Sequence, residues 1–287
     1  MSILPTEFQF VVVQTWPFWF WPAFVIVILT GLQILSVLVP LLFSGSNKIP
    51  RRGKHLDELE ATDLKYIWIN KFATALFVFH FFKYTTTAPN IKWGRDEMTI
   101  GNTLGAYIAF YFFYDFFYMW FHRILHLRSV YEHIHKHHHR YIAETSFFFT
   151  YLIIIVLCFW RQKVPTRGNI DAINVHPFEF ITGEYLHLVT VLTIPCHIYT
   201  AMFFIIIGGI LASLNHTRFD VSIPYIYDVK VHDVHHSQSP ESNYGQYTMF
   251  WDRVFSTFKP YSSLNKTAWF RILNIIYLEI MFAAMLL

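Results

Sequence analysis

Long apolar stretches separated by short polar connections dominate the chain. A helix needs about 20 mostly apolar residues to cross a bilayer, and four stretches approach or exceed that length: residues 18–43, 66–82, 103–121 and 186–213. The last is long for one pass and short for two, and Pro195 interrupts it, so we expect a broken helical hairpin there. A fifth stretch, residues 269–287, contains Arg271 and Glu279 and fits either a spanning or an interfacial helix.

This pattern predicts an all-α, polytopic membrane protein with about four transmembrane helices or hairpins. The composition agrees, because 54% of the 287 residues are hydrophobic and only 14% are charged, whereas soluble domains have about 25% charged residues. The net charge of +3 is too small to indicate a nucleic-acid partner. Cys158 and Cys196 both lie in apolar stretches and are expected to be reduced and buried.

Lysine and arginine predict the orientation in the membrane. The sequence KIPRRGK at residues 48–54 follows the first apolar stretch, and no lysine or arginine precedes that stretch. Since short cytosolic loops are enriched in these residues, the third stretch should deliver His122 to the cytosolic surface. The apolar segment 147–160 is short for a span and is followed by Arg161 and Lys163, so we expect a re-entrant or interfacial helix there.

Histidines supply the candidate chemistry. Sixteen are present, and His122 and His126 are four residues apart, which places them on one face of a helix. Two triplets share the offsets 0, 3 and 4, an arc of about 100° on a helix; they are His135, His138 and His139, and His232, His235 and His236. Eight imidazoles could therefore converge. On a helix, His133 and His137 would fall on the face opposite the first triplet.

Neutral imidazole is a ligand for zinc, copper, iron and nickel. Structural zinc sites have four ligands and usually include cysteine. Eight histidines without a usable cysteine favour two metal ions with open positions, and iron is the redox-active candidate. A membrane-surface stretch whose histidines contact headgroups is the simpler alternative. It does not explain why the same offsets recur 97 residues later, from His135 to His232.

Asp115 is a carboxylate within an apolar stretch, where charge is costly and often functional. It precedes His122 by seven residues and so lies on the same helical face, roughly 10 Å deeper. Two interpretations stay open: a catalytic role, as a partner of a metal ligand or in a substrate or proton path, and a neutral or hydrogen-bonded structural carboxyl group.

Over residues 113–260 the chain resembles the fatty acid hydroxylase and sterol desaturase superfamily of membrane di-iron oxygenases. The resemblance rests on three histidine boxes, HRILH, HKHHH and HDVHH, and is supported by HPFE, NHTRFD and NYGQYTMFWDRVFSTF. It implies nine iron ligands: His122, His126, His135, His138, His139, His216, His232, His235 and His236. His176 is a possible further ligand, and His137 occupies the variable position of the second box.

The resemblance also suggests three parts. Residues 1–100 would hold the N-terminal transmembrane helices and a basic cytosolic loop, residues 101–262 the catalytic domain, and residues 263–287 a C-terminal apolar helix. His139 and His176 are farther apart than the family pattern implies, which indicates an insertion near residues 147–165.

The implied function is the use of O₂ and external electrons to hydroxylate, desaturate or oxidise an unactivated C–H bond of a sterol, fatty acyl or sphingoid lipid. Two iron ions would be the cofactors. Because the chain lacks a GxGxxG motif, electrons are expected from a carrier such as cytochrome b5 with its NAD(P)H reductase. The expected location is the endoplasmic reticulum membrane, with the site facing the cytosol. A metal-handling membrane protein and a non-catalytic lipid-binding family member are the alternatives.

Overall fold

The computed structural model describes residues 4–49, 59–140 and 169–261, and these residues are mostly helical. Five long helices form the body: α1 (Phe20–Leu42), α2 (Ala61–Thr85), α3 (Ala106–Leu125), α5 (Pro177–Thr193) and α6 (Ile198–Asn215). Three helices are short: α4 (Arg128–Tyr131) follows the first histidine box, α7 (Val229–Ser237) contains the third, and α8 (Phe250–Val254) lies near the last described residues.

Short 3-10 or π-helical segments and two-residue strands lie before and between the helices. Parallel β1 (Ile91–Lys92) pairs with β2 (Cys196–His197), and β3 (Ser222–Ile223) pairs antiparallel with β4 (Tyr227–Asp228). The short 3-10 segments are η1 (Thr6–Val11), η2 (Val13–Thr15), η3 (Arg95–Glu97), η5 (His138–Arg140) and η6 (Asn169–Ala172), and η4 (Gly101–Gly105) is π-helical. The prediction of an all-α architecture is thus confirmed in its main features.

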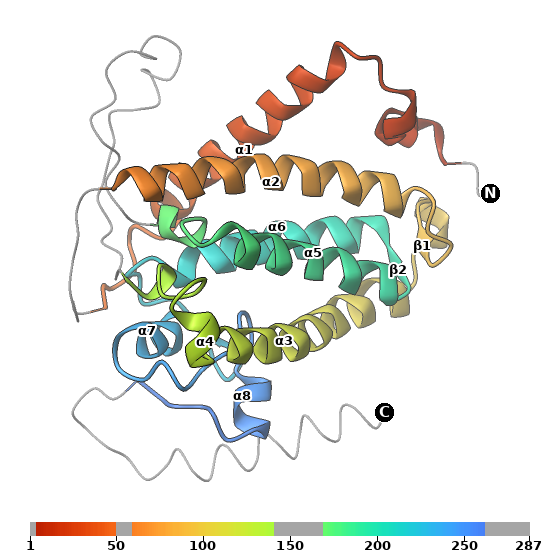
Figure 1. Cartoon of the computed structure of the whole chain (residues 1–287). Helices are drawn as coiled ribbons and strands as arrows, with labels where there is room; N and C mark the ends of the chain where they lie inside the picture. The colour runs from red at the N-terminus through yellow and green to blue at the C-terminus, as the bar shows by residue number, and fades with distance from the viewer. Residues whose placement is uncertain (1–3, 50–58, 141–168, 262–287) are drawn as a thin grey trace.

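Helices α2, α3, α5 and α6 run alongside one another, and α1 lies at an angle to them (Figure 1). Helix α5 packs against α2 and α3, whereas α6 packs against α1 and α3. Buried aromatic and aliphatic side chains fill the centre, among them Phe110, Val191 and Phe204. Figure 1 also shows α4 and α7 at one end of this bundle and the β1–β2 pair at the other.

A break at residues 194–197 separates α5 from α6. Ile194 adopts an extended conformation directly before Pro195, as expected for a residue that precedes proline. The Asn90 side-chain amide donates to the carbonyl of Leu192 at 2.9 Å and so satisfies the end of α5. The hairpin expected within residues 186–213 is therefore present, but α5 begins earlier, at Pro177, and His176 and His216 flank the two arms.

Two helices of the described part are long and apolar enough to cross a membrane, α1 and α6. Little of α1 is buried, only Phe24 and Val39, and Ile26, Val27 and Leu42 are exposed, as expected for a lipid-facing surface. The count of four spans is not confirmed. Helices α2 and α3 have 25 and 20 residues and are long enough, but both are less apolar than α1 and α6, because α2 contains Asp63 and Lys71 and α3 is rich in tyrosine. Segments 147–160 and 269–287, and the insertion expected near 147–165, lie outside the described residues.

Candidate metal centre

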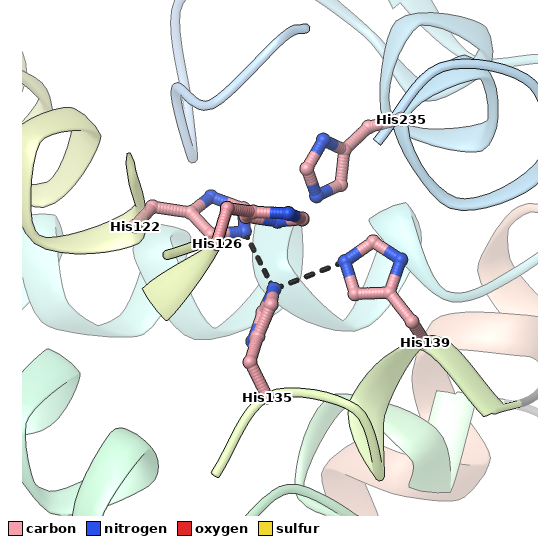
Figure 2. A group of neighbouring side chains, drawn as sticks. All are labelled: His122, His126, His135, His139 and His235. Carbon is pink, nitrogen blue, oxygen red and sulfur yellow. Dashed lines mark hydrogen bonds between the residues drawn. The ribbon is translucent and has the colours of Figure 1, made fainter. Parts of the chain in front are cut away.

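Five histidines from four parts of the chain converge at the end of the bundle that carries α4 and α7. Helix α3 supplies His122 in its last turn and His126 at its C-cap, the following turns supply His135, η5 supplies His139, and α7 supplies His235. One ring nitrogen of each lies within 4.8 Å of the others. Figure 2 shows the rings pointing toward a common centre. We call these residues the five-histidine group.

The ring nitrogens of this group are crowded in a way that protons alone cannot satisfy. The Nε2 atom of His135 lies 3.0 Å from Nε2 of His122 and 3.0 Å from Nε2 of His139, the two contacts drawn in Figure 2. A proton on His135 Nε2 could satisfy one of these neighbours but not both. A cation placed among the lone pairs satisfies all three.

The other nitrogens of three rings are oriented by buried oxygen atoms. His122 Nδ1 donates to the carbonyl of Tyr244 at 2.9 Å, and His235 Nδ1 donates to the carbonyl of Ser242 at 2.6 Å. His135 Nδ1 lies 2.9 Å from Oε1 of Glu179, which is 5% exposed. A hydrogen bond at Nδ1 fixes the tautomer and leaves Nε2 as the metal-binding atom.

Glu179 reaches His135 because α5 begins at Pro177. The chain enters this helix with His176 as the N-cap, and its Nδ1 accepts from the backbone N–H of Phe178 at 3.2 Å. Proline at the first helical position removes an N–H that would otherwise lack a partner. The HPFE sequence thus places Glu179 in the first turn, facing the second histidine box. His176 caps the helix and belongs to neither histidine group.

The backbone carbonyls that orient His122 and His235 belong to one loop, residues 242–248, and two buried aspartates hold it. Asp115 of α3 accepts from the backbone N–H groups of Gln246, Tyr247 and Thr248 at 3.2, 3.0 and 2.5 Å. Asp252 of α8 accepts from the backbone N–H groups of Tyr244 and Gly245, each at 2.8 Å.

Gly245 is required by the tightness of this loop. A Cβ atom there would lie 2.5 Å from the carbonyl oxygen of Thr248 and 3.0 Å from Oδ2 of Asp252. Gly245 and Asp252 belong to the NYGQYTMFWD sequence. The Asp252 carboxyl group fixes the loop backbone, and the loop carbonyls orient the histidines. The structure places Asp115 at the base of this loop, with both carboxyl oxygens bonded to backbone.

Four further histidines form a second group: His138, His216, His232 and His236. One ring nitrogen of each lies within 4.8 Å of the others. We call these residues the four-histidine group. The two groups are adjacent, because the rings of His139 and His236 stack with centroids 4.5 Å apart. Nitrogen ligands about 2.1 Å from one ion lie at most about 4.2 Å apart, so each group needs only small side-chain shifts to hold a metal.

Burial keeps these imidazoles in the neutral form that binds metals. Desolvation lowers the pKa of His126 to about 4 and that of His216 to about 4. Desolvation and the neighbouring histidines together lower the pKa of His235 and of His236 well below the usual value of 6.5. At neutral pH the two groups therefore present lone pairs and not charges.

The structure brings together all nine histidines expected from the three boxes and from His216, but it distributes the triplets differently from a simple helical face. His135 and His139 belong to the five-histidine group, whereas His138 belongs to the four-histidine group. The third box is divided in the same way. Turns cover residues 132–137, so helical geometry does not apply across the second box.

His133 and His137 stay outside both groups, as expected, but His137 contacts a second polar cluster. Its Nε2 lies 3.1 Å from Oδ1 of Asp63 and 3.0 Å from Oδ1 of Asn174. The Asn174 amide donates to Asp63 and Asp171, which fixes its orientation and requires a proton on His137 Nε2. This cluster fastens the second box to α2 and to the segment before α5.

The sequence did not predict three parts of the site: Glu179, the carbonyls of Ser242 and Tyr244, and the Asp63–His137–Asn174 cluster. HPFE contained a signal for Glu179, since a carboxyl group near a cluster of histidines is a common partner of a ligand. Backbone carbonyls have no signal in the sequence at all.

Residues 161–257 match the family model described as fatty acid hydroxylase. The matched region includes Glu179, His216 and the third histidine box, whereas the first two boxes precede it. No curated protein and no solved structure matches the chain. The match covers about a third of the chain, and for residues 161–257 it confirms the resemblance to the fatty acid hydroxylase and sterol desaturase superfamily that the histidine boxes indicate.

Proposed function

We propose that this protein is a membrane-bound di-iron oxygenase that hydroxylates, desaturates or oxidises an unactivated C–H bond of a lipid. The family is one of oxidoreductases that act on lipids. The observation that carries the proposal is the pair of adjacent histidine groups, with nine ring nitrogens in two clusters. Iron is the favoured metal because two all-nitrogen sites with open positions suit redox chemistry better than structural zinc.

The residues present fit such a centre. Both ring nitrogens of His232 and of His236, and Nε2 of His126 and of His235, are buried without a hydrogen-bond partner among the described residues. Buried polar atoms are rarely left unpaired, so an ion that accepts their lone pairs accounts for them. Bound iron would supply O₂ and electron chemistry. The chain orients the ligands through Glu179 and loop 242–248 and excludes water by burying them.

Iron oxygenases of this kind need electrons, and we propose that a cytosolic carrier such as cytochrome b5 supplies them. Arg123, Arg128 and Arg140 lie near the histidine groups in sequence, and Arg128 is exposed. Arg123 stacks on the rings of Trp120 and Tyr244, so substituting it would also disturb loop 242–248. Arg128→Glu is the cleaner test, and it should raise the carrier concentration needed for half-maximal turnover.

Arg95→Glu is the matched control for carrier docking, because Arg95 is also exposed but lies in η3, near the end of the bundle opposite α4. An Arg128→Glu variant with the same carrier requirement as Arg95→Glu would count against docking at this surface. The proposed location, a membrane such as that of the endoplasmic reticulum with the site facing the cytosol, follows from the same need for cytosolic electrons.

A metal-handling protein is the alternative from another class. Transporters place polar ligands near the midplane of the membrane, whereas both histidine groups lie at one end of the bundle (Figure 1). Bound zinc without O₂ consumption would support the transporter. A family member that binds lipid without chemistry would show iron but no product.

Lipid profiling of cells that express the chain tests the proposed activity. Wild type should produce a new oxidised or desaturated lipid that is absent with His235→Ala, because His235 belongs to the five-histidine group. His133→Ala is the matched control, since His133 is exposed and outside both groups, and it should retain the product. Identical sterol, fatty acyl and sphingoid profiles for wild type and His235→Ala would overturn the activity.

A further inference from the structure

The two histidine groups differ in how their ligands are supported. In the five-histidine group, three rings have their second nitrogen bonded to a buried oxygen atom: the Tyr244 carbonyl, the Ser242 carbonyl and the Glu179 carboxyl group. These oxygens are themselves held in place, since α5 carries Glu179 and the two aspartates Asp115 and Asp252 secure the loop.

The described residues give the four-histidine group no comparable support. His232 is 6% exposed, and both of its ring nitrogens, like both of those of His236, have no hydrogen-bond partner among the described residues. A metal takes one nitrogen of each ring, which leaves the other without a partner among the described residues. The four-histidine group also offers one ring nitrogen fewer to a metal than the five-histidine group does.

A small cavity beside His232 offers room for a partner of its second ring nitrogen. The cavity has a volume of about 20 Å³, and its lining includes His232, Asn215 and Thr248. One water needs about 10–15 Å³ and at least two polar partners. His232 is thus positioned to bond to a water, which orients a ring less firmly than a fixed carbonyl or carboxyl group.

Resting on the proposed metal centre, we propose that the two sites bind metal unequally, with a tight site at the five-histidine group and a labile one at the four-histidine group. Each oxygen partner of a ligating histidine changes metal affinity by about 10–100-fold. With three such partners in one group and none from the described protein atoms in the other, the two affinities should differ by at least about 10-fold. Metal would load in two steps and leave in the reverse order.

Graded chelation of the full-length protein tests this directly. The protein is purified in detergent, loaded anaerobically with Fe(II) and dialysed against increasing concentrations of chelator, and iron per chain is measured by mass spectrometry. The expected curve shows a plateau at one iron per chain over at least about a 10-fold range of chelator. Loss of both irons in a single transition overturns the inequality while leaving the proposed di-iron centre intact.

Two substitutions identify which site is tight. His236→Ala should remove the labile iron and leave one iron that resists chelation like the wild-type plateau. Glu179→Gln should weaken retention of the tight iron by about 10–100-fold, with the fold monitored by circular dichroism. If folded His236→Ala loses both irons, or if folded Glu179→Gln retains the tight iron as wild type does, the assignment is overturned.

Glu184→Gln is the matched control for Glu179→Gln. Glu184 lies on the same helix, accepts from the Thr74 hydroxyl at 2.5 Å and belongs to neither group, so this variant should keep the wild-type plateau. Should the variants not fold, the wild-type curve alone decides between two steps and one. A wild-type chain that binds no iron would overturn the proposed function together with this inference.

Discussion

Replacing Asp115 by asparagine tests whether this buried carboxylate holds the loop that orients the metal ligands. The carboxylate accepts three backbone N–H groups from residues 246–248 and is fully buried. An asparagine retains one acceptor oxygen, but its NH₂ group must face at least one backbone N–H, so one charge-assisted bond is lost and one buried donor is left without a partner. Hydrogen bonds to charged groups contribute about 1.5–3 kcal/mol each.

The expected loss in the free energy of unfolding is therefore about 2–4 kcal/mol. For a domain of this size, that loss lowers the midpoint of thermal unfolding by about 5–10 °C. Because the same loop carries the carbonyls of Ser242 and Tyr244, iron retention should fall as well, by about 10-fold or more. The assays are thermal unfolding in detergent, followed by circular dichroism, and iron content after dialysis against chelator.

Asp96→Asn is the control for this experiment, since it makes the same chemical change at an exposed carboxylate. It should leave both the unfolding midpoint and the iron content as in wild type. If Asp115→Asn matches Asp96→Asn in both measurements, the proposed role of Asp115 in holding loop 242–248 is refuted.

Two further predictions concern the same supports. Gly245→Ala should destabilise the protein by about 1–3 kcal/mol, because its Cβ would lie 2.5 Å from the Thr248 carbonyl oxygen. Gly31→Ala is the control and should not destabilise the protein, because nothing lies within 4 Å of a Cβ atom there. Equal unfolding midpoints for the two variants would contradict the close approach at Gly245. His137→Ala should cost about 1–3 kcal/mol by removing a buried partner of Asp63 and Asn174, and it should lower iron retention by loosening the second box. Exposed His133→Ala is its control, and identical iron retention in the two would rule out a positioning role for His137.

The apolar pattern was sufficient to predict several helices, because burial in a bilayer or a helical bundle leaves a periodic or continuous signal. It placed His122 at the end of a long helix and a break at Pro195. It did not predict that α5 begins at Pro177, because the first turns of this helix mix Glu179 and Gly183 with apolar residues. The predicted count of four spans stays unconfirmed, since length alone does not separate a spanning helix from a helix of the bundle.

For the candidate site, sequence spacing identified the histidines but not their grouping. The offsets 0, 3 and 4 suggested one helical face, yet His138 and His139 belong to different groups because the second box adopts tight turns. The contacts of Asp115 could not be foreseen, since its partners are backbone N–H groups 131–133 residues away. Such long-range contacts depend on the tertiary fold and leave no local pattern.

The iron content of the purified full-length protein is the measurement that tests the central claim most directly. Two adjacent groups of histidine nitrogens predict close to two irons per chain in wild type and in His133→Ala, and a clear loss in His235→Ala, with all three variants folded. A wild-type protein without iron, or an iron content that is the same in His235→Ala as in His133→Ala, would contradict a di-iron centre built from these nine histidines.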